Sequence, residues 1–400
     1  MRTLLILSIL AAALQAATLP ELIESARSKH PTLEAIKARI RAADYVIESS
    51  KNFDNPVFGL GISDIRVDNP MNRSLEPMQT NSVSFSQKIP WFGKTEAKYA
   101  LARASRRVLS ASFKEAEAIL FARIKESVYR LWEIQRLMEV TRRSIDLTEQ
   151  NIELFRVYTA TNDSREAHMG IISAELVKSR LKTSLKRLKA KKEGVLALLG
   201  YLSFSDTKEV EISLPDKNVV SLEKALSKVK VSPPIEKEEA KKEVASRYLE
   251  LNRLQTTIDP VVSLGYFQRE AYEDYISVGL RFSLPLYGSE KSKIEESKAL
   301  LLARKSALEE SKLRIGARIE ELVAIAGKNR EIVDIIENES LPKINHMFDL
   351  IRSDIATGAD MYKFVDILEQ KLRLDAEAIS ARTKLYIALA QIEAILGEEL

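Results

Sequence analysis

The sequence predicts a mostly α-helical protein with a small β part. Glycine and proline number only 13 and 12 among 400 residues, about half their usual share, so few positions can break a helix. Charged residues reach 30% and both signs are interleaved, as on the solvent-facing sides of long helices. Against this background, four short segments alternate apolar and polar residues with a period of two, which is typical of strands.

Residues 1–17 have the pattern of a secretory signal peptide. Arg2 precedes the apolar run Leu4–Leu14, and the small residues Ala16 and Ala17 follow it. This order matches the basic, apolar and cleavage-site regions of an export signal, with the first turn of a buried helix as the alternative. No later segment has the roughly twenty continuous apolar residues that a transmembrane helix needs. We therefore expect an exported chain that enters a membrane, if at all, with strands.

An internal duplication divides the rest of the chain. Asn55–Gly61 reappears as Asp259–Gly265, and Asn81–Gly93 corresponds to Tyr275–Gly288, with the same Pro-x-aromatic-Gly ending. A repeat of this kind indicates that both halves of the chain carry the same structural unit.

We expect the two repeats to cover residues 18–200 and 235–400. Each begins with a helix, continues with two strands and ends with a helical hairpin, at 94–199 in the first repeat and 289–397 in the second. Residues 201–234 are predicted to be a connector. Three prolines are expected to interrupt any long helix there: Pro215, Pro233 and Pro234.

The four strands are expected at about 55–66, 80–90, 259–268 and 274–285. In the last strand Ile276, Val278 and Leu280 alternate with serine, glycine and arginine, so one face is apolar and the other polar. About ten residues is the length that a tilted strand needs to cross a bilayer. The pattern predicts transmembrane strands, with half-buried soluble strands as the alternative.

Aromatic residues follow the second strand of each repeat. Trp91 and Phe92 come after the first pair of strands, and Tyr287 comes after the second pair. Because Trp and Tyr concentrate at membrane–water interfaces, we predict that these three side chains contact lipid at the edge of a membrane. Four strands cannot close a barrel wide enough for a channel. If they cross a membrane, several copies of the chain must share one barrel.

Long helices are predicted for the remainder of both repeats. Lys94–Val157 and Ser289–Ile355 are nearly free of glycine and proline, and each predicts a rod of about 65 residues, close to 100 Å long. Pro342 is predicted to kink the second rod, because proline lacks a backbone donor. Shorter helices are expected at Leu19–Phe53, Arg165–Leu199, Ile235–Thr257 and Ala359–Leu396.

The last helix has the seven-residue spacing of a coiled coil. Its apolar positions are separated by charged ones and predict a row that neighbouring helices cover: Met361, Val365, Leu368, Leu372, Ile379, Tyr386 and Leu389. Gly200 and Gly397 are expected to end the two hairpins, since glycine is favoured just after a helix C-terminus.

This order of elements resembles the TolC-type outer-membrane efflux protein family over essentially the whole mature chain. Pro90–Lys94 and the run from Leu341-Pro342 through Gly358 to Val365–Gln370 look most like the branch that serves heavy-metal resistance pumps. The resemblance implies a homotrimer whose twelve strands form one barrel in the outer membrane, with the helices forming a periplasmic tunnel. It also implies a tip that docks a periplasmic adaptor protein, itself bound to an inner-membrane efflux pump. The expected function is a passive conduit for metal ions or small toxic compounds.

The resemblance places an acidic pair, Asp366 and Glu369, at the periplasmic entrance as a pore gate. The two residues lie three positions apart and therefore on one helix face. In three copies they would form a ring of carboxylates that favours cations, and the alternative is that both simply solvate the exposed side of a coiled coil. Where the best-known pattern has a tyrosine and an arginine near the gating glycine, this chain has Ile355 and Asp360. The corresponding salt-bridge lock is therefore absent or rebuilt here.

The tip of the first hairpin is expected at a polar turn. The predicted adaptor contacts come from this turn and from the second hairpin: Thr161, Asn162, Asp163, Ser164, Arg165, Gly358 and Asp360. An ordinary helix–helix turn is the alternative. His168-Met169 and His346-Met347 contain ligand types that suit soft metal ions, but two isolated pairs predict neither a metal site nor a cofactor.

Several other classes of protein are disfavoured. The formal charge is only +4, from 61 basic and 57 acidic residues, and no basic stripe indicates a nucleic-acid partner. Cysteine is absent, which excludes disulfides and thiolate chemistry. The sequence has no P-loop, His-Glu-x-x-His or Gly-x-Ser-x-Gly motif, so we expect a protein that is not an enzyme. The alternative function is a soluble periplasmic coiled-coil adaptor or structural spacer, which the whole-chain duplication disfavours.

Overall fold

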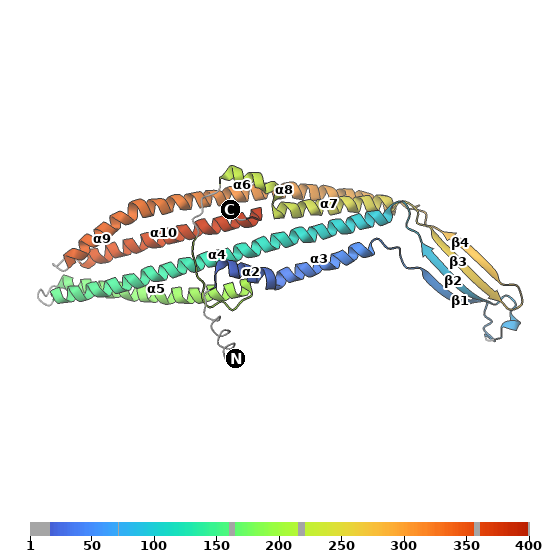
Figure 1. Ribbon diagram of the computed structural model, residues 1–400, viewed down its shortest axis with the longest axis horizontal. Helices are drawn as coiled ribbons and strands as arrows, with labels where there is room; N and C mark the ends of the chain where they lie inside the picture. Colours follow the sequence, from blue (N-terminus) through green and yellow to red (C-terminus); the bar gives the residue numbers. More distant parts are fainter. Residues whose placement is uncertain (1–16, 71, 160–164, 215–220, 356–360, 399–400) are drawn as a thin grey trace, which may run out of the picture. The chain divides into compact units, whose positions relative to one another are not determined.

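The computed structural model describes residues 17–70, 72–159, 165–214, 221–355 and 361–398. Within these ranges the chain is mostly helical and contains one four-stranded antiparallel sheet (Figure 1). The predicted fold class, mostly α with a small β part, is confirmed. The predicted signal peptide lies outside the described residues apart from Ala17, which forms a parallel bridge with Val210.

The helices have the following bounds. Those before the connector are α2 (Leu19–Lys29), α3 (Pro31–Ser49), α4 (Lys94–Thr159) and α5 (Arg165–Ser203). The connector contains α6 (Leu222–Lys228) and the 3₁₀ turn η3 (Val229–Val231). Those after it are α7 (Pro233–Leu254), α8 (Ser289–Ile335), α9 (Leu341–Ile355) and α10 (Met361–Leu396).

The first predicted helix, Leu19–Phe53, is wrong as a single element, because it is two helices. The break falls at His30, which is extended with φ −67° and ψ 122°. A residue before proline is pushed away from the helical region by the ring of that proline, and Pro31 starts α3. At the start of α2, the Thr18 N–H donates to Glu21 Oε2 at 2.9 Å.

Proline also begins α7, contrary to the expectation that Pro233 and Pro234 only interrupt helices. Proline is well tolerated in the first helical turn, where its missing N–H has no partner to lose. Gly397 follows α10 with φ +74°, and a Cβ at this glycine would lie 2.5 Å from Cγ of Pro233. Gly200, by contrast, lies inside α5, which continues to Ser203.

The second rod is interrupted just before Pro342 and not at it. Ile336–Ser340 forms the π-helical turn η4, in which the Leu341 N–H donates to the Ile336 carbonyl five residues earlier. α9 begins immediately afterwards and carries Pro342 in its first turn. Because proline has no N–H, Pro342 cannot donate to a carbonyl of η4. Figure 1 shows the path curving from α8 into α9. α4 has no such interruption along its 66 residues.

The sheet contains β1 (Val57–Ser63), β2 (Thr80–Lys88), β3 (Val261–Arg269) and β4 (Tyr275–Arg281). The strands lie in sequence order and each pairs antiparallel with the next. The sheet therefore consists of one hairpin from each repeat, joined by the pairing of β2 with β3.

The chain forms two compact units, and neither unit is one repeat. The first contains residues 1–34, 114–233 and 313–400, and the second contains residues 35–113 and 234–312, including the sheet. Both units draw residues from both repeats. The duplicated sequence therefore does not fold as two separate lobes.

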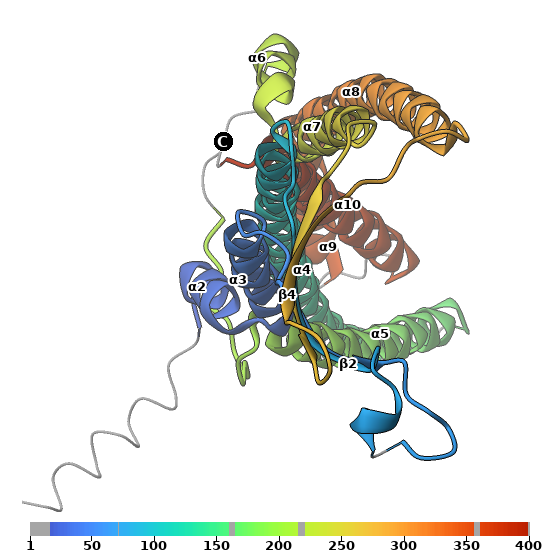
Figure 2. The same cartoon turned by 90° about the vertical axis from the view of Figure 1, so that its right-hand side faces the viewer.

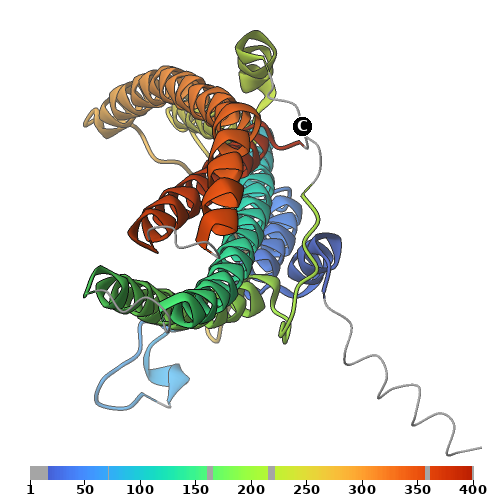
Figure 3. The same cartoon turned by 90° about the vertical axis from the view of Figure 1, so that its left-hand side faces the viewer.

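In the first unit α10 packs against α5 and α9, as Figure 3 shows for the red and green helices. Its contact with α4 includes the rings of Tyr129 and Tyr386, whose centroids lie 5.3 Å apart. Lys125 Nζ of α4 lies 2.7 Å from Glu393 Oε2 of α10, and both side chains are buried. A buried ion pair tolerates little displacement because either charge alone would be left without a partner. The pair therefore helps to set how α10 lies along α4.

Candidate functional site

One face of the sheet is apolar and exposed across all four strands. Leu60 in β1 and Val278 in β4 are each 75% exposed, although side chains of this kind are usually buried. The strand register places the apolar residues in adjacent rows: Phe58, Leu60, Ile62, Val83, Phe85, Val262, Leu264, Tyr266, Ile276, Val278 and Leu280. Large contiguous apolar surfaces mark contacts with a membrane or with another protein.

The middle of the opposite face is built from small residues. Gly59 pairs with Ser84 and Gly61 pairs with Ser82, while Ser263 pairs with Gly279. The packing is close, since a Cβ at Gly59 would lie 2.7 Å from Ser84 Oγ. The middle of this face carries hydroxyl groups and little bulk, so it suits contact with water. Towards one end of the strands the same face carries the stacked rings of Phe267 and Tyr275, whose centroids lie 4.7 Å apart. A sheet with an apolar exposed face and a small polar face has the pattern of a transmembrane barrel strand.

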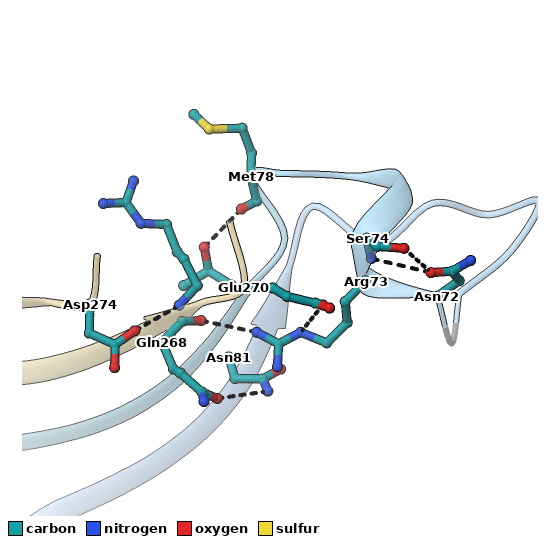
Figure 4. Close-up of polar contacts among 10 residues, drawn as sticks. Asn72, Arg73, Ser74, Met78, Asn81, Gln268, Glu270 and Asp274 are labelled. Atoms are coloured by element: carbon teal, nitrogen blue, oxygen red, sulfur yellow. Dashed lines mark hydrogen bonds and ion pairs between the residues drawn. The ribbon is translucent and has the colours of Figure 1, made fainter. Parts of the chain in front are cut away.

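At the far ends of the strands, the loop between β1 and β2 is anchored to β3 (Figures 2 and 4). Arg73, in the short turn η2 (Arg73–Leu75), donates from Nη2 to the Gln268 carbonyl at 3.3 Å. Arg73 Nε also lies 3.7 Å from Glu270 Oε2. The neighbouring Asn81 Nδ2 donates to Gln268 Oε1 at 3.5 Å. The loop is therefore held at the strand ends by side chains from both repeats.

At the other end of the sheet, a buried lysine joins the two repeats. Lys94 Nζ donates to Asp259 Oδ1 and to the Thr257 carbonyl, each at 2.7 Å. Its side chain is only 5% exposed, and that of Asp259 is 20% exposed. Lys88 Nζ lies 3.6 Å from Asp259 Oδ2, and the Trp91 N–H donates to Oδ1 at 3.3 Å. Burial would raise the pKa of the Asp259 carboxyl, but the hydrogen bonds from Lys94 and Trp91 outweigh it and hold this pKa below its ordinary value.

The three predicted interface aromatics lie beside this junction and are exposed. Trp91 and Phe92 are 48% and 62% exposed between β2 and α4, and Tyr287 is 97% exposed between β4 and α8. Each group precedes a glycine with φ +75°, Gly93 and Gly288. Positive φ is readily available to glycine, which lets the chain turn sharply from strand to helix. The predicted contact of these aromatics with lipid stays a prediction.

The helical tip has a core drawn from α4, α5, α9 and α10. Its fully buried residues include Phe364, Leu368 and Ala174, with Phe348 and Ile152 beside them. α5 and α10 approach closely here, because a Cβ at Gly170 would lie 2.9 Å from Cβ of Met361. The row predicted for α10 is buried at five positions and half-buried at Leu372 and Ile379. This packing leaves the other side of α10 facing away from the core.

Asp366 and Glu369 lie on that outer side of α10. Asp366 is exposed and accepts a hydrogen bond from Gln370 Nε2 at 2.8 Å. The Glu369 side chain is 44% exposed, and its Oε1 lies 3.7 Å from Arg180 Nη1 of α5. Arg180 is itself 71% exposed, so solvent weakens this ion pair. The two carboxylates share a helix face as predicted, and a cation that the sequence did not indicate lies beside one of them.

Most of the predicted adaptor contacts lie outside the described residues. These are Thr161, Asn162, Asp163, Ser164, Gly358 and Asp360. Arg165 is described and is exposed at the start of α5.

The two His-Met pairs are on helix surfaces. His168 and Met169 are exposed on α5, and His346 and Met347 are exposed on α9. Among the described residues no group of three or more His, Cys, Asp or Glu side chains is placed to hold a metal ion. In the same part of the chain, no helix combines the length and the apolar character needed to cross a membrane.

Three residues important to these sites were not identified from the sequence. Arg73, Arg180 and Asp259 each act on a partner far away along the chain, and pattern reasoning detects only local spacing. The duplication did contain one usable signal. Aligning the repeats puts Asp259 opposite Asn55 and Lys94 opposite Ser289, so the charged residues stand out as differences between the copies.

Known proteins give a match in structure but not in sequence. No family model and no curated protein matches the chain. The outer membrane protein VceC from Vibrio cholerae is similar with a TM-score of 0.80 and 15% identity, over 95% of this chain and 96% of VceC. The outer membrane channel MtrE from Neisseria gonorrhoeae, in its open state, has a TM-score of 0.81 and 14% identity, over 95% and 89%. CusC, which forms a transmembrane channel, has a TM-score of 0.81 and 11% identity, over 95% of this chain and 92% of CusC. At these identities the likeness shows the fold, which this chain shares along nearly its whole length.

Proposed function

We propose that this chain is an outer-membrane channel, a passive trimeric conduit that carries solutes from the periplasm to the exterior. The observation that carries the proposal is the sheet, which has one exposed apolar face and an opposite face with glycine and serine across its middle. The fold shared with outer membrane channels supports it. Three chains would supply twelve strands, enough for a barrel with an open interior.

The proposal includes the partners that the resemblance implies. A tripartite export system needs an adaptor protein that reaches the tip of the helices and an inner-membrane pump that supplies the driving force. Exposed Arg165, with the predicted contacts outside the described residues, is our proposed part of that docking tip. The proposed cargo is metal ions or small toxic compounds. The likeness to CusC is no stronger than that to MtrE, so these two similarities do not distinguish metal ions from small toxic compounds.

The primary test is where the protein resides and how many chains form the particle. Separation of inner and outer membranes, followed by sizing of the detergent-extracted protein, should give a three-chain particle from the outer membrane. Recovery from the periplasm without detergent would contradict the proposal and leave the soluble adaptor or spacer as the working model.

A pair of substitutions tests the assignment of the two sheet faces. Leu60→Lys places a charge on the apolar face, where a lysine near the bilayer midplane costs about 2–4 kcal/mol. Ser84→Lys places the same charge on the polar face, where contact with water keeps its cost small. We expect Leu60→Lys to reduce the amount of trimer in the outer membrane far more than Ser84→Lys does. Equal losses would contradict the assignment.

We propose that Asp366 and Glu369 form the cation-selective entrance of this conduit. Replacing both with Asn and Gln should lower cation selectivity in planar-bilayer recordings, because it removes the fixed negative charge at the entrance. Arg180→Gln should raise cation selectivity, since it removes the cation 3.7 Å from Glu369. Glu211→Gln, an exposed change in the connector, is the matched control. Unchanged selectivity in all variants would remove the gate from the proposal.

A further inference from the structure

A cavity of about 1070 Å³ lies within the second unit, where the strands meet the helices. Its walls include the ends of β2 and β4 and the first two turns of α4 and α8. Five basic and three acidic side chains line it, a net charge of +2: Lys88, Lys94, Lys98, Arg281, Lys293, Asp54, Asp259 and Glu290. A concave surface with an excess of one sign of charge concentrates ions of the opposite sign.

The five cations of the cavity differ in whether they have a counter-charge. Lys88 and Lys94 share the carboxylate of Asp259. The side chains of Lys98, Arg281 and Lys293 form no ion pair or hydrogen bond with any residue that the structure describes. These three cations therefore remain available to a ligand.

The strand register assigns the basic residues of the sheet to one face. Lys88 is opposite Val261, and Val261 is opposite Arg281, so the three side chains form one row across the sheet. The row two residues further along the strands is small and polar: Ser86, Ser263 and Gly279. Lys88 and Arg281 therefore continue the face with glycine and serine across its middle. In the proposed channel this face lines the interior, which solutes in water reach and lipid does not.

The two unpaired lysines occupy aligned positions in the two repeats. Aligning Gly93 with Gly288 puts Lys98 opposite Lys293. Each lysine comes five residues after a glycine with φ +75°, in the second turn of the helix that follows a pair of strands. Both repeats therefore present a cation at the same structural position. Three copies of the chain would place six such lysines around the conduit.

We propose that this cavity is a binding subsite for small soluble anions that carry phosphate or carboxylate groups, with Lys98, Arg281 and Lys293 as the residues that bind them. The guanidinium of Arg281 presents a planar fork of N–H donors that matches two oxygens of such a group. The lysines add charge-assisted hydrogen bonds. The inference rests on the proposed conduit and names a class of solute that its wall binds. The subsite is distinct from Asp366 and Glu369, which belong to the other unit.

The acidic residues of the cavity predict an effect of the opposite sign. The Glu290 carboxylate also lines the cavity and forms no ion pair or hydrogen bond with a described residue. It repels an incoming anion, because like charges in one cavity interact unfavourably. Glu290→Gln should therefore strengthen the binding of an anion by about twofold to fivefold.

Calorimetric titration with inorganic pyrophosphate tests the subsite, using the full chain extracted in an uncharged detergent at low ionic strength. Arg281→Gln combined with Lys293→Gln removes two of the unpaired cations and should weaken binding about tenfold or more. The matched control combines Arg304→Gln with Lys305→Gln, which removes the same charges from exposed positions of α8 outside the cavity. Its affinity should stay within about twofold of the native value, since solvent and salt screen distant charges.

The same variants are then compared in planar-bilayer recordings. Pyrophosphate should reduce the conductance of the native chain and of the control more than that of the cavity variant. Equal affinities of the cavity variant and the control, or no binding by the native chain, would overturn the subsite. Anionic phospholipid that native mass spectrometry finds on the native chain and not on the cavity variant would overturn the assignment to a soluble anion.

The two measurements separate this inference from the proposed function. A channel that conducts but binds no pyrophosphate would overturn the subsite and leave the conduit in place. Absence of conductance in the native chain and in every variant would contradict the conduit, and with it the place of the subsite on the conduit wall, while the titration would still decide whether the cavity binds anions.

Discussion

The two repeats differ most clearly where their strands give way to helices. In the junction formed within the chain, buried Lys94 is bound by Asp259 and by a backbone carbonyl. In the aligned repeats, Lys94 corresponds to Ser289 and Asp259 corresponds to Asn55, and both Ser289 and Asn55 are neutral. The junction motif is therefore charged at one pair of aligned positions and neutral at the other.

The charged version of the junction depends on both partners being present. Lys94 and Asp259 belong to one chain, so both leave water in the same folding step and neither is buried alone. Loss of either partner would leave the other charge without its counter-charge in a mostly buried place, which is costly.

The two long rods show a second difference, in how the repeats tolerate a change in length. α4 is continuous, whereas the second rod contains the π turn η4 before α9. A single π turn is equivalent to one extra residue in an α-helix. The turn before Pro342 therefore holds one residue more than a turn of α4 does.

The largest expected effect comes from deleting one residue in each rod. Deleting Arg142 from α4 rotates everything after it by about 100°, so buried Ile145, Ile152 and Phe155 leave the core and the folded state is lost. Deleting Asn338 from η4 should convert the π turn to α-helix and change stability by only about 1–2 kcal/mol. Thermal unfolding followed by circular dichroism compares the two deletions. Equal destabilisation would show that η4 is not an insertion.

The next largest loss of stability is expected at the charged junction of Lys94 and Asp259. Asp259→Asn keeps the shape of the side chain but leaves the Lys94 ammonium buried without its counter-charge, and we expect a loss of about 3 kcal/mol in unfolding free energy. Asn55→Asp is the matched change at the aligned position and should shift stability by less than about 0.5 kcal/mol. Denaturant unfolding of the detergent-extracted protein measures both. A small effect of Asp259→Asn would mean that water reaches Lys94.

The same pair predicts a dependence of stability on pH. Because the pKa of Asp259 is lower in the folded chain than in the unfolded chain, its contribution is fully present above the unfolded value of about 4. The contribution decreases as pH falls through the folded pKa, where the carboxylate becomes protonated. Unfolding curves between neutral and acidic pH should therefore converge for the native chain and Asp259→Asn. Parallel curves would exclude a role for the carboxylate.

The smallest expected effect tests whether the difference between the junctions can be removed. In the proposed trimer, Asn55→Asp combined with Ser289→Lys should build a second charged junction where two chains meet, and stabilise the trimer by about 0.5–1 kcal/mol per contact. The temperature at which the trimer dissociates on gels is the measurement, with the two single substitutions as controls. A lower dissociation temperature for the double variant than for both singles would contradict the alignment of the junctions.

Local patterns in the sequence were sufficient for the strands and most of the helices. The alternation at Ile276, Val278 and Leu280 predicted β4 because neighbouring side chains in a strand point to opposite faces. The predictions of helix ends that were wrong depend on neighbouring residues, which composition does not describe. His30 breaks the first helix because Pro31 follows it, while Gly200 stays inside α5 because the surrounding apolar residues pack there.

The sequence by itself determined the duplication, the length of the rods and which residues share a face, since all of these follow from spacing along one chain. Only the tertiary structure decided that Glu369 lies beside Arg180, that Asp259 holds Lys94, and that the helix makes the π turn η4 before Pro342. These contacts join residues from different elements, so no local spacing encodes them. The apolar face of the sheet combines both kinds of information: its composition is readable in the sequence, whereas its exposure follows from the absence of any helix packed over it among the residues that the structure describes.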